Sequence, residues 1–471
     1  MNATETKNMQ RLEELAHKTP QFTNQDATAI TGMSYLDVEQ GIKEMMAKYH
    51  CKLRVTENGD IIYDFEKLER RDAKKFSEYL QEFGEKAWKV FTIIYKFLIS
   101  AFLVVYFIIF LVLVIAAVVA MSSGKDNRSR NGGGELLSFV FRLFISIFQW
   151  RTIMGYNQYY YQTDRYGYQY RHYQEKEDDL TKNWKGNQSK KGFVASVFDF
   201  VFGPPRYELN PLANLQELST YLKTHKYVVS TYELIALAGW TKAEAEDFMT
   251  FSLTQFNGEA KMTDNGILYG DFNSISRRKT EIDGAPIVYY WDENEADYEL
   301  NGNSSGRNMG IIAMNGFNLL ISFFFLYHSN NPELGNTMLV LGIIPFIFSL
   351  SFFLIPFIRY LIILQKRRMQ HRINIRKRLI RYIFHEQSGI ISLERLTQVA
   401  NQNKGEKLNK KLIEQMMMDI IRDFDARSEV DENGQIQYHF EPLEEELSDM
   451  DKLRDGNTGN KNNLGNIVFE T

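Results

Sequence analysis

Residue types that could support catalysis or metal binding are sparse in this chain. His385-Glu386 starts like the zinc-protease motif H-E-x-x-H, but the second histidine is absent. Gly124-Lys125 lacks the glycine five residues earlier that a phosphate-binding loop requires. Cys51 is the single cysteine, which excludes an intrachain disulfide and an all-cysteine zinc or iron–sulfur site. We therefore expect no catalytic residues, no metal, no cofactor and no enzymatic activity.

One run of charge could bind a ligand by electrostatics. Between residues 366 and 381 the chain carries eight Lys or Arg side chains and no acidic one, directly after an apolar segment. Such a run is typical of contacts with anionic lipid headgroups beside a membrane span. RNA contact is the alternative that the charge leaves open. The candidate contact residues are Lys366, Arg367, Arg368, Arg372, Arg376, Lys377, Arg378 and Arg381.

Length and composition bound the architecture that must position these residues. The chain has 471 residues, which allows about three domains. Its mean hydropathy of −0.33 excludes a mostly membrane-embedded transporter. The 55 Lys and Arg against 59 Asp and Glu give a net charge of −4, so no overall field attracts nucleic acid.

Apolar runs of membrane-spanning length divide the chain. Residues 91–121 have one charge and no Gly or Pro, and about 20 apolar residues suffice to cross the hydrocarbon. Residues 311–328 and 337–365 read as a helical hairpin, with Pro345 and Pro356 expected to kink its second helix. Residues 136–150 are shorter and carry a polar stripe, so they either lie in the interface or cross as a short second span.

A hairpin signature occurs three times in the soluble segments. Residues 56–65, 263–272 and 431–440 each contain an acidic residue, Asn-Gly, apolar residues, Tyr and Phe. Asn-Gly between apolar alternations predicts a tight hairpin turn, because both residues accept positive φ. The expected turns are Asn58-Gly59, Asn265-Gly266 and Asn433-Gly434.

Two short helices are predicted upstream of each hairpin. From Gly32 to Gly59, and again from Gly239 to Gly266, the spacing is 27 residues, and the third copy is looser. Helix, turn, helix and hairpin in 60–70 residues is the layout of a winged helix. Three unrelated α/β pieces with a shared turn are the alternative that order and spacing disfavour.

The second helix of each pair predicts what the modules bind. In a DNA-binding winged helix it enters the major groove and exposes Arg, Lys, Asn or Gln. Here the net charge is −1 over residues 34–50, −2 over 241–256 and −1 over 409–425. Acidic recognition surfaces predict protein partners rather than nucleic acid.

Segment boundaries follow from these patterns. The first part of the chain is expected to contain a winged-helix-like module at 1–90, a transmembrane helix at 91–121, and a basic loop with a short second membrane or interfacial helix at 122–156. A Tyr-rich linker at 157–192 should follow, then an apolar lead-in and second module at 193–275, and a linker with a short strand (285–291) at 276–308. The last part should contain a transmembrane hairpin at 309–365, a basic helix and third module at 366–443, and a disordered tail at 444–471.

Several motifs also resemble a known family. The runs SFFLIPFIRYLIILQKR (351–367) and SVFDFVFG (196–203), together with the Asn-Gly hairpins, are similar to winged-helix-containing membrane proteins of cyanobacteria and plant plastids. Those proteins are loosely described as iron–sulfur cluster biosynthesis proteins. The resemblance covers most of residues 20–380, and its structural motifs imply the family rather than an activity.

These patterns together predict an α+β and membrane α-helical protein. Three winged-helix-like modules surround a small helical transmembrane domain, and basic residues flank the hairpin 309–365 on the side expected to be cytoplasmic. We expect a multi-pass protein of the bacterial inner membrane that acts as a scaffold or adaptor. The alternatives are a membrane-tethered nucleic-acid-binding regulator and an assembly factor for a membrane complex or metal centre. Expected partners are membrane lipids and unidentified proteins, with a homo-oligomer also compatible with the sequence.

Overall fold

A computed structural model places the chain in two compact units. The α/β unit comprises Met1–Ala73, Leu209–Glu295 and His371–Thr471, and the helical unit comprises Lys74–Glu208 and Ala296–Gln370. The structure describes residues 3–66, 68–71, 76–122, 159–163, 169–173, 193–203, 210–295, 300–303, 305–327, 338–386, 389–401, 408–456 and 464–470.

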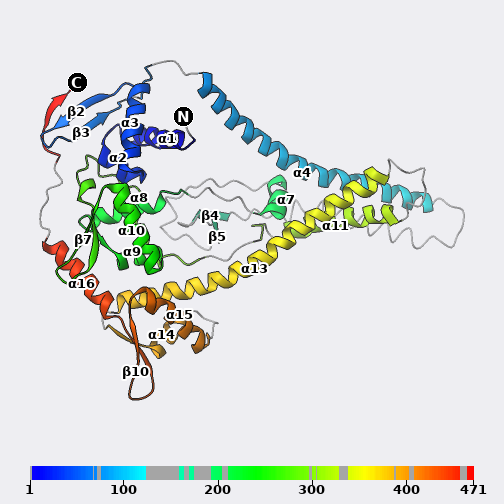
Figure 1. The fold of residues 1–471 in the computed structure, drawn as a ribbon. Coiled ribbons are helices and arrows are strands. Elements are labelled where there is room, and N and C mark those ends of the chain that lie inside the picture. Colours follow the sequence, from blue (N-terminus) through cyan, green and yellow to red (C-terminus); the bar gives the residue numbers. More distant parts are fainter. Residues whose placement is uncertain are drawn as a thin grey trace. The chain divides into compact units, whose positions relative to one another are not determined.

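The α/β unit contains three modules with one order of elements (Figure 1). Module 1 comprises α1 (Ala3–Lys18), β1 (Gln21–Thr23), α2 (Asn24–Thr31), α3 (Tyr35–Lys48), β2 (Lys52–Thr56) and β3 (Ile61–Asp64). Module 2 comprises α8 (Ala213–Thr224), β6 (Val228–Ser230), α9 (Thr231–Ala238), α10 (Lys242–Phe256), β7 (Glu259–Met262) and β8 (Leu268–Asp271). Module 3 comprises the end of α13 (Ile344–His385), β9 (Ile390–Ser392), α14 (Leu393–Ala400), α15 (Lys410–Asp423), β10 (Arg427–Val430) and β11 (Ile436–His439).

Sheet topology repeats with the elements. In each module the last strand lies between the other two and pairs antiparallel with both, in the orders β1-β3-β2, β6-β8-β7 and β9-β11-β10. Gln21 lies opposite Asp64 as Val228 lies opposite Asp271, so modules 1 and 2 match residue for residue at an offset of 207. Module 3 keeps the strand pattern but has a longer connection between α14 and α15.

Local capping explains where the short helices begin and end. Thr23 caps the N-terminus of α2. Its side-chain oxygen accepts the Asp26 N–H, and the Asp26 carboxylate accepts the Thr23 N–H. These two bonds satisfy N–H groups that have no partner within the first turn of the helix. The helix ends at Gly32, and the equivalent α9 ends at Gly239. Both glycines have φ of 72°, the left-handed conformation that residues with a side chain rarely adopt.

The hairpin turns lie where the Asn-Gly pairs predict them, but their geometry differs from the expectation. The glycines Gly59, Gly266 and Gly434 have φ of 80°, 85° and 75°, whereas none of the preceding asparagines has a positive φ. Each glycine N–H donates to the carbonyl three residues earlier, at 2.9 to 3.0 Å. In each turn, a residue with right-handed helical backbone angles therefore precedes a glycine whose backbone is in the left-handed region.

Valine at these turns should destabilise the module that carries it. We expect Gly59→Val and Gly266→Val each to cost about 1–3 kcal/mol, since a β-branched side chain is strained at positive φ. No atom lies within 4 Å of a Cβ built on Gly59, so the cost there would come from the backbone and not from a clash. Hydrogen exchange of the flanking strand amides in the full-length protein measures the effect, and unchanged protection would contradict it.

Apolar side chains make one separate core and one shared core in this unit. Module 1 encloses its own core, in which Phe22, Met45 and Phe65 are buried. Modules 2 and 3 share a second core, which contains Phe256 of module 2, Phe424 of module 3 and apolar residues at the end of α13. Modules 2 and 3 therefore pack against each other and are not separate domains with cores of their own.

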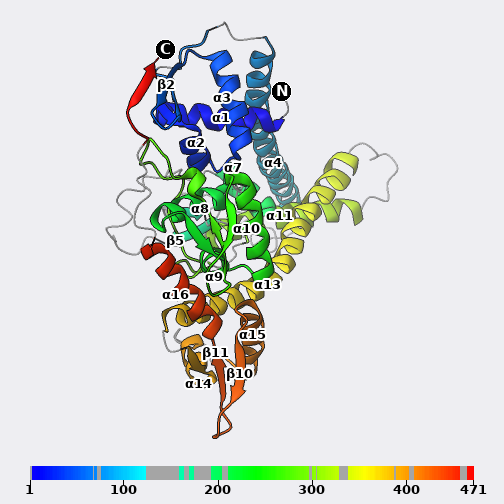
Figure 2. The ribbon, with the colours of Figure 1, turned by 60° about the vertical axis from the view of Figure 1, so that its left-hand side comes forward.

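The C-terminal residues contradict the expected disorder after residue 444. Glu441–Gly456 form α16, whose Met450 packs against Val228 and Tyr269 of module 2. Ile467–Glu470 form β12, which pairs with β2 of module 1, beside which Figure 2 shows it. The acidic and Asn/Gly-rich composition concealed both elements, because each is stabilised by a distant module and not by its own sequence.

The linker after module 2 also differs from its prediction. Residues 285–291 do not form the expected strand, and their contacts are to helices. The Tyr290 N–H donates to the Ala236 carbonyl at the end of α9, at 2.9 Å. A Cβ on Gly239 would lie 2.3 Å from the Tyr290 ring, so this glycine is required both by its φ and by the close approach.

The helical unit has the long apolar helices that the sequence predicts. Among the described residues, three helices are long and apolar enough to cross a membrane, at Lys86–Ala120, Ser305–Tyr327 and Leu339–His385. The described helices of this unit are α4 (Phe76–Ser122), α7 (Phe193–Phe202), α11 (Ser305–Tyr327), the π-helical turn η4 (Leu339–Ile343) and the first part of α13. α13 passes through Pro356 and continues as one helix to His385, so the basic segment is helical (Figure 1).

Polar side chains join the long apolar helices. Asn315 of α11 donates its amide to the Ser349 carbonyl of α13 at 2.9 Å, and Asn318 donates to the Leu103 carbonyl of α4 at 3.0 Å. Such bonds hold helices together where apolar lipid offers no competing partner.

Two expectations concern the segment between α4 and α7. The segment 136–154, expected to form a short second membrane or interfacial helix, lies outside the described residues. Within the expected Tyr-rich linker, β4 (Tyr159–Thr163) and β5 (Gln169–Tyr173) pair as antiparallel strands. Tyrosine favours strands, a propensity that reading the segment as a linker overlooked.

Candidate interaction surfaces

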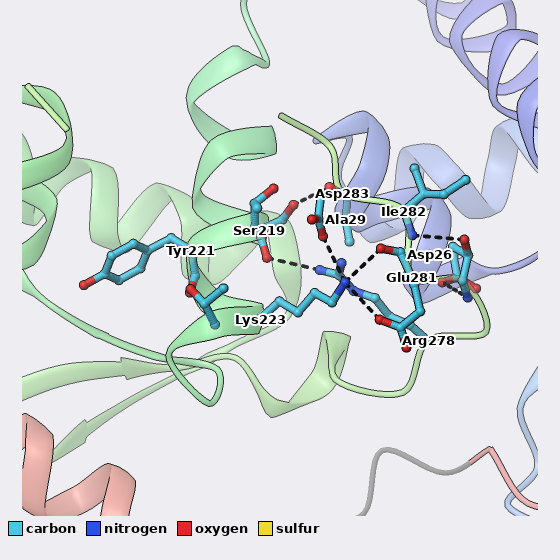
Figure 3. Close-up of polar contacts among 12 residues, drawn as sticks. Asp26, Ala29, Ser219, Tyr221, Lys223, Arg278, Glu281, Ile282 and Asp283 are labelled. Atoms are coloured by element: carbon cyan, nitrogen blue, oxygen red, sulfur yellow. Dashed lines mark hydrogen bonds and ion pairs between the residues drawn. The ribbon is translucent and has the colours of Figure 1, made fainter. Parts of the chain in front are cut away.

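A buried carboxylate at the start of α2 connects module 1 to module 2. Asp26 is fully buried, and its oxygens accept the backbone N–H groups of Lys279 at 2.9 Å and Thr280 at 3.1 Å. Figure 3 shows Asp26 facing the segment that follows module 2. The backbone N–H and hydroxyl of Thr23 also donate to Asp26, so both carboxylate oxygens have partners at the start of α2.

Further polar contacts surround this junction (Figure 3). Ser219 of α8 donates its hydroxyl to the Ala29 carbonyl, and Arg278 donates to the Ser219 carbonyl at 3.2 Å. Lys223 lies 3.1 Å from both Glu281 and Asp283. The junction is thus a polar interface within the chain, in which side chains bind both backbone carbonyls and one another.

The equivalent carboxylate of module 2 connects that module to α16. Glu233 stands 207 residues after Asp26, is buried, and accepts the Tyr221 hydroxyl at 2.8 Å. Arg454 of α16 forms an ion pair with Glu233 at 2.7 Å, with side chains 12% and 6% exposed. Burial and the Glu233 charge raise the pKa of Tyr221 well above its ordinary value. In both modules a later segment of the chain therefore satisfies the same carboxylate.

A cavity of about 340 Å³ opens beside Glu233. Tyr289 and Trp291 stack with parallel rings at 5.2 Å on its wall. The lining carries both signs of charge, and Arg454 already neutralises Glu233. Its principal lining residues are Tyr221, Glu233, Tyr289, Trp291, Arg381 and His385.

The described residues offer little for catalysis or metal binding. Among them, no group of three or more His, Cys, Asp or Glu side chains is arranged to hold a metal ion. Burial raises the pKa of the Cys51 thiol to about 11, so it is protonated and unreactive at neutral pH.

Glu446 of α16 is a titratable group that the sequence analysis did not single out. It lines a cavity of about 220 Å³ between α16 and module 2, and it accepts the Tyr232 N–H at 2.8 Å. Burial raises its pKa to about 7. The spacing of Leu443, Glu446 and Met450 on one helical face was the signal in the sequence.

Docking of α16 should consequently weaken as the pH rises. Because the pKa of Glu446 is higher in the folded state than in the unfolded state, its stabilisation is full below about pH 4.5 and lost as the pH passes through 7. A shift of this size corresponds to about 3 kcal/mol. We expect Glu446→Gln to be less sensitive than wild type between pH 5 and 8, measured by hydrogen exchange of α16. Equal pH dependence of the two proteins would contradict the assignment.

The second helix of each module exposes one large apolar side chain, and on α10 this side chain shares the surface with acidic residues. Leu36 of α3, Phe251 of α10 and Met418 of α15 are 76%, 48% and 64% exposed. On α10, Phe251 shares the exposed surface with Glu244, Glu246 and Asp247. On α10, an exposed aromatic residue on an acidic helix suits a protein partner better than a phosphate backbone.

The basic segment of α13 divides into two parts. Arg376 forms an ion pair with Asp423 at 2.7 Å, and Lys377 lies 3.5 Å from Glu295 and over the Tyr290 ring. These two residues are therefore structural, contrary to the expected headgroup or RNA contact. Arg378 is partly buried, Lys366 is half-buried, and Arg367, Arg368, Arg372 and Arg381 are exposed.

The chain itself covers two of the three hairpin turns. Asn265 donates its amide to both carboxylate oxygens of Asp449 in α16, at 2.9 and 2.8 Å. At the first turn, Glu57 accepts from Asn466 beside β12. At the third turn, Asp431 accepts the N–H groups of Asn433 and Gln435, so these contacts stay within the hairpin.

No protein-family model, curated protein or solved structure matches the chain. The resemblance to the cyanobacterial and plastid membrane family is untested by these comparisons. What the chain does is therefore argued from the surfaces described above.

Proposed function

We propose that the chain is a membrane-anchored, non-enzymatic scaffold that binds proteins through three winged-helix-like modules. The order helix, strand, helix, helix, strand, strand supports the winged-helix assignment. The exposed surface of α10 carries the proposal, because it combines Glu244, Glu246 and Asp247 with the large apolar side chain of Phe251. A groove-reading helix would need basic and amide side chains there.

The contacts between modules support one orientation in the bacterial inner membrane. Modules 1 and 2 are joined at Asp26, and modules 2 and 3 share a core, so all three lie on one side of the membrane. α11 and α13 supply an even number of crossings between modules 2 and 3, whereas α4 alone would separate modules 1 and 2. The apolar residues 136–150 are the candidate for the missing return crossing. The basic residues after the last span support a cytoplasmic location of the modules.

Thiol labelling of intact cells should report this topology. In a Cys51→Ser background we expect a single cysteine at Ser129 or Asn330 to react with an impermeant reagent and one at Glu281 to be protected. Glu281 is a fair control, because its side chain is 95% exposed and burial cannot explain protection. Labelling of Glu281→Cys without labelling of Ser129→Cys would reverse the orientation.

A photo-reactive amino acid in place of Phe251 tests the proposed function in native membranes. We expect protein adducts of defined mass at this position, since Phe251 projects from the acidic surface of α10. The matched control is the same amino acid in place of Glu394 on the exposed side of α14. Adducts only with lipid or nucleic acid, or identical adducts at both positions, would contradict a partner surface on α10.

A nucleic-acid-binding regulator is the second candidate, and the exposed arginines of α13 favour it. Arg376 and Lys377 are occupied by Asp423 and Glu295, which reduces the charge available to phosphates. We therefore expect no salt-sensitive retention of duplex DNA or RNA by the intact protein near physiological salt. Retention that Arg368→Glu and Arg372→Glu abolish would favour the regulator instead. A role as an assembly factor for a membrane complex or metal centre is a special case of the scaffold.

A further inference from the structure

The C-terminal strand shows how one module binds an extended segment. β12 pairs antiparallel with β2, so that Ile467 lies opposite Thr56 and Glu470 opposite Arg54. The Arg54 guanidinium contacts the Glu470 carboxylate at 2.8 Å. Side chains of β12 between these points stay exposed. Backbone pairing and one acidic residue, rather than core burial, therefore define this contact.

Module 2 presents the same edge, and no strand in the described part of the chain pairs with its outer side. By register, Lys261 of β7 occupies the position of Arg54, and Asp271 that of Asp64. The basic residues make equivalent ion pairs, Arg54 with Asp64 at 3.3 Å and Lys261 with Asp271 at 2.6 Å. Lys261 also lies 3.2 Å from Glu259, which stands where module 1 has Lys52. Among the described strands, β7 pairs with β8 alone, and all four of its residues are exposed.

Module 3 has the open edge but not the charge. Glu429 of β10 stands at the position of Arg54, and its carboxylate lies 3.7 Å from His439. If a strand paired with β10 as β12 pairs with β2, its acidic residue at the position of Glu470 would lie opposite Glu429. The two negative charges would repel each other. The two open edges are therefore not equivalent.

We propose that the outer edge of β7 docks an extended segment of a partner protein, with apolar residues followed by an acidic residue that pairs with Lys261. The chemistry of the segment is that of Ile467–Glu470, the strand that the equivalent edge of module 1 already holds. This site specifies one partner contact of the proposed scaffold and rests on that function.

Strand alternation provides a substitution that closes the edge without breaking the sheet. The Thr263 N–H points inward and donates to the Ile267 carbonyl, so the Met262 N–H points outward. Proline at Met262 removes that donor and leaves the pairing with β8 intact. Met262→Ala, which keeps the N–H, is the matched control.

The test uses a fluorescein-labelled peptide of residues 464–470 (LGNIVFE) and the full-length protein in detergent, with anisotropy as the readout. We expect saturable binding to wild type and Met262→Ala, and at least tenfold weaker binding to Met262→Pro. Lys261→Glu should also weaken binding about tenfold, and a peptide with lysine in place of Glu470 should restore it. The charge-swapped pair keeps the test decisive if the proline variant misfolds.

Three outcomes would overturn the proposal. In the first outcome, the peptide does not bind to the wild-type protein. In the second, it binds, but Met262→Pro and Lys261→Glu leave its affinity unchanged. In the third, the wild-type protein is a dimer that becomes monomeric when residues 464–471 are deleted. The second outcome would place the peptide on β2 by exchange with β12, and the third would make a second copy the occupant. Protein adducts at position 251 together with no peptide binding would reject this site while leaving the scaffold standing.

Discussion

Replacing Asp26 by alanine is expected to destabilise the junction between modules 1 and 2 by about 3–5 kcal/mol. The change leaves the N–H groups of Thr23, Lys279 and Thr280 without their acceptor, and a buried unsatisfied donor costs about 1–3 kcal/mol. It also removes half of the capping box of α2. Chemical denaturation of the full-length protein, with hydrogen exchange of α2 and of residues 279–280, measures the loss.

Asp37→Ala is the matched control for this prediction. Asp37 occupies the same position in the first turn of α3 and contacts the Ser34 hydroxyl at 2.7 Å, but it is exposed. We expect it to cost about 1 kcal/mol or less, the ordinary range for a solvated cap. Equal losses for Asp26→Ala and Asp37→Ala would mean that burial and the contact with module 2 contribute nothing.

Arg454→Leu is expected to release α16 from module 2. The substitution leaves Glu233 buried without its ion-pair partner, and breaking a buried pair from one side costs about 3–5 kcal/mol. It also removes the donor to the Val228 carbonyl. Hydrogen exchange of α16 and of the first turn of α9 should rise together in this variant.

A double substitution and an exposed control separate charge from packing. In Glu233→Gln/Arg454→Leu the buried charge is gone, so part of the lost stability should return. Arg422→Leu removes an exposed ion pair with Asp419 and should change stability by about 0.5 kcal/mol or less. A double variant no more stable than Arg454→Leu would show that α16 is held by its apolar contacts alone.

Features that depend on neighbouring residues could be predicted from the sequence. The Asn-Gly turns, the glycine ends of α2 and α9 and the long apolar helices are encoded within short stretches of chain. Turn chemistry, capping and apolar periodicity act over a few residues. Even so, the turns show positive φ only at glycine, because a turn residue adopts what its hydrogen bonds require and not everything it tolerates.

Contacts between distant segments were decided by the tertiary structure alone. Asp26 and Lys279 are 253 residues apart, and nothing near either residue marks them as partners. Likewise, α16 and β12 are held by surfaces that exist only after modules 1 and 2 have folded, so their composition suggested disorder. The positive charge of residues 366–381 was evident from the sequence. That Arg376 and Lys377 bind carboxylates of the chain itself depends on which side of α13 packs inward, a choice made by the shared core of modules 2 and 3.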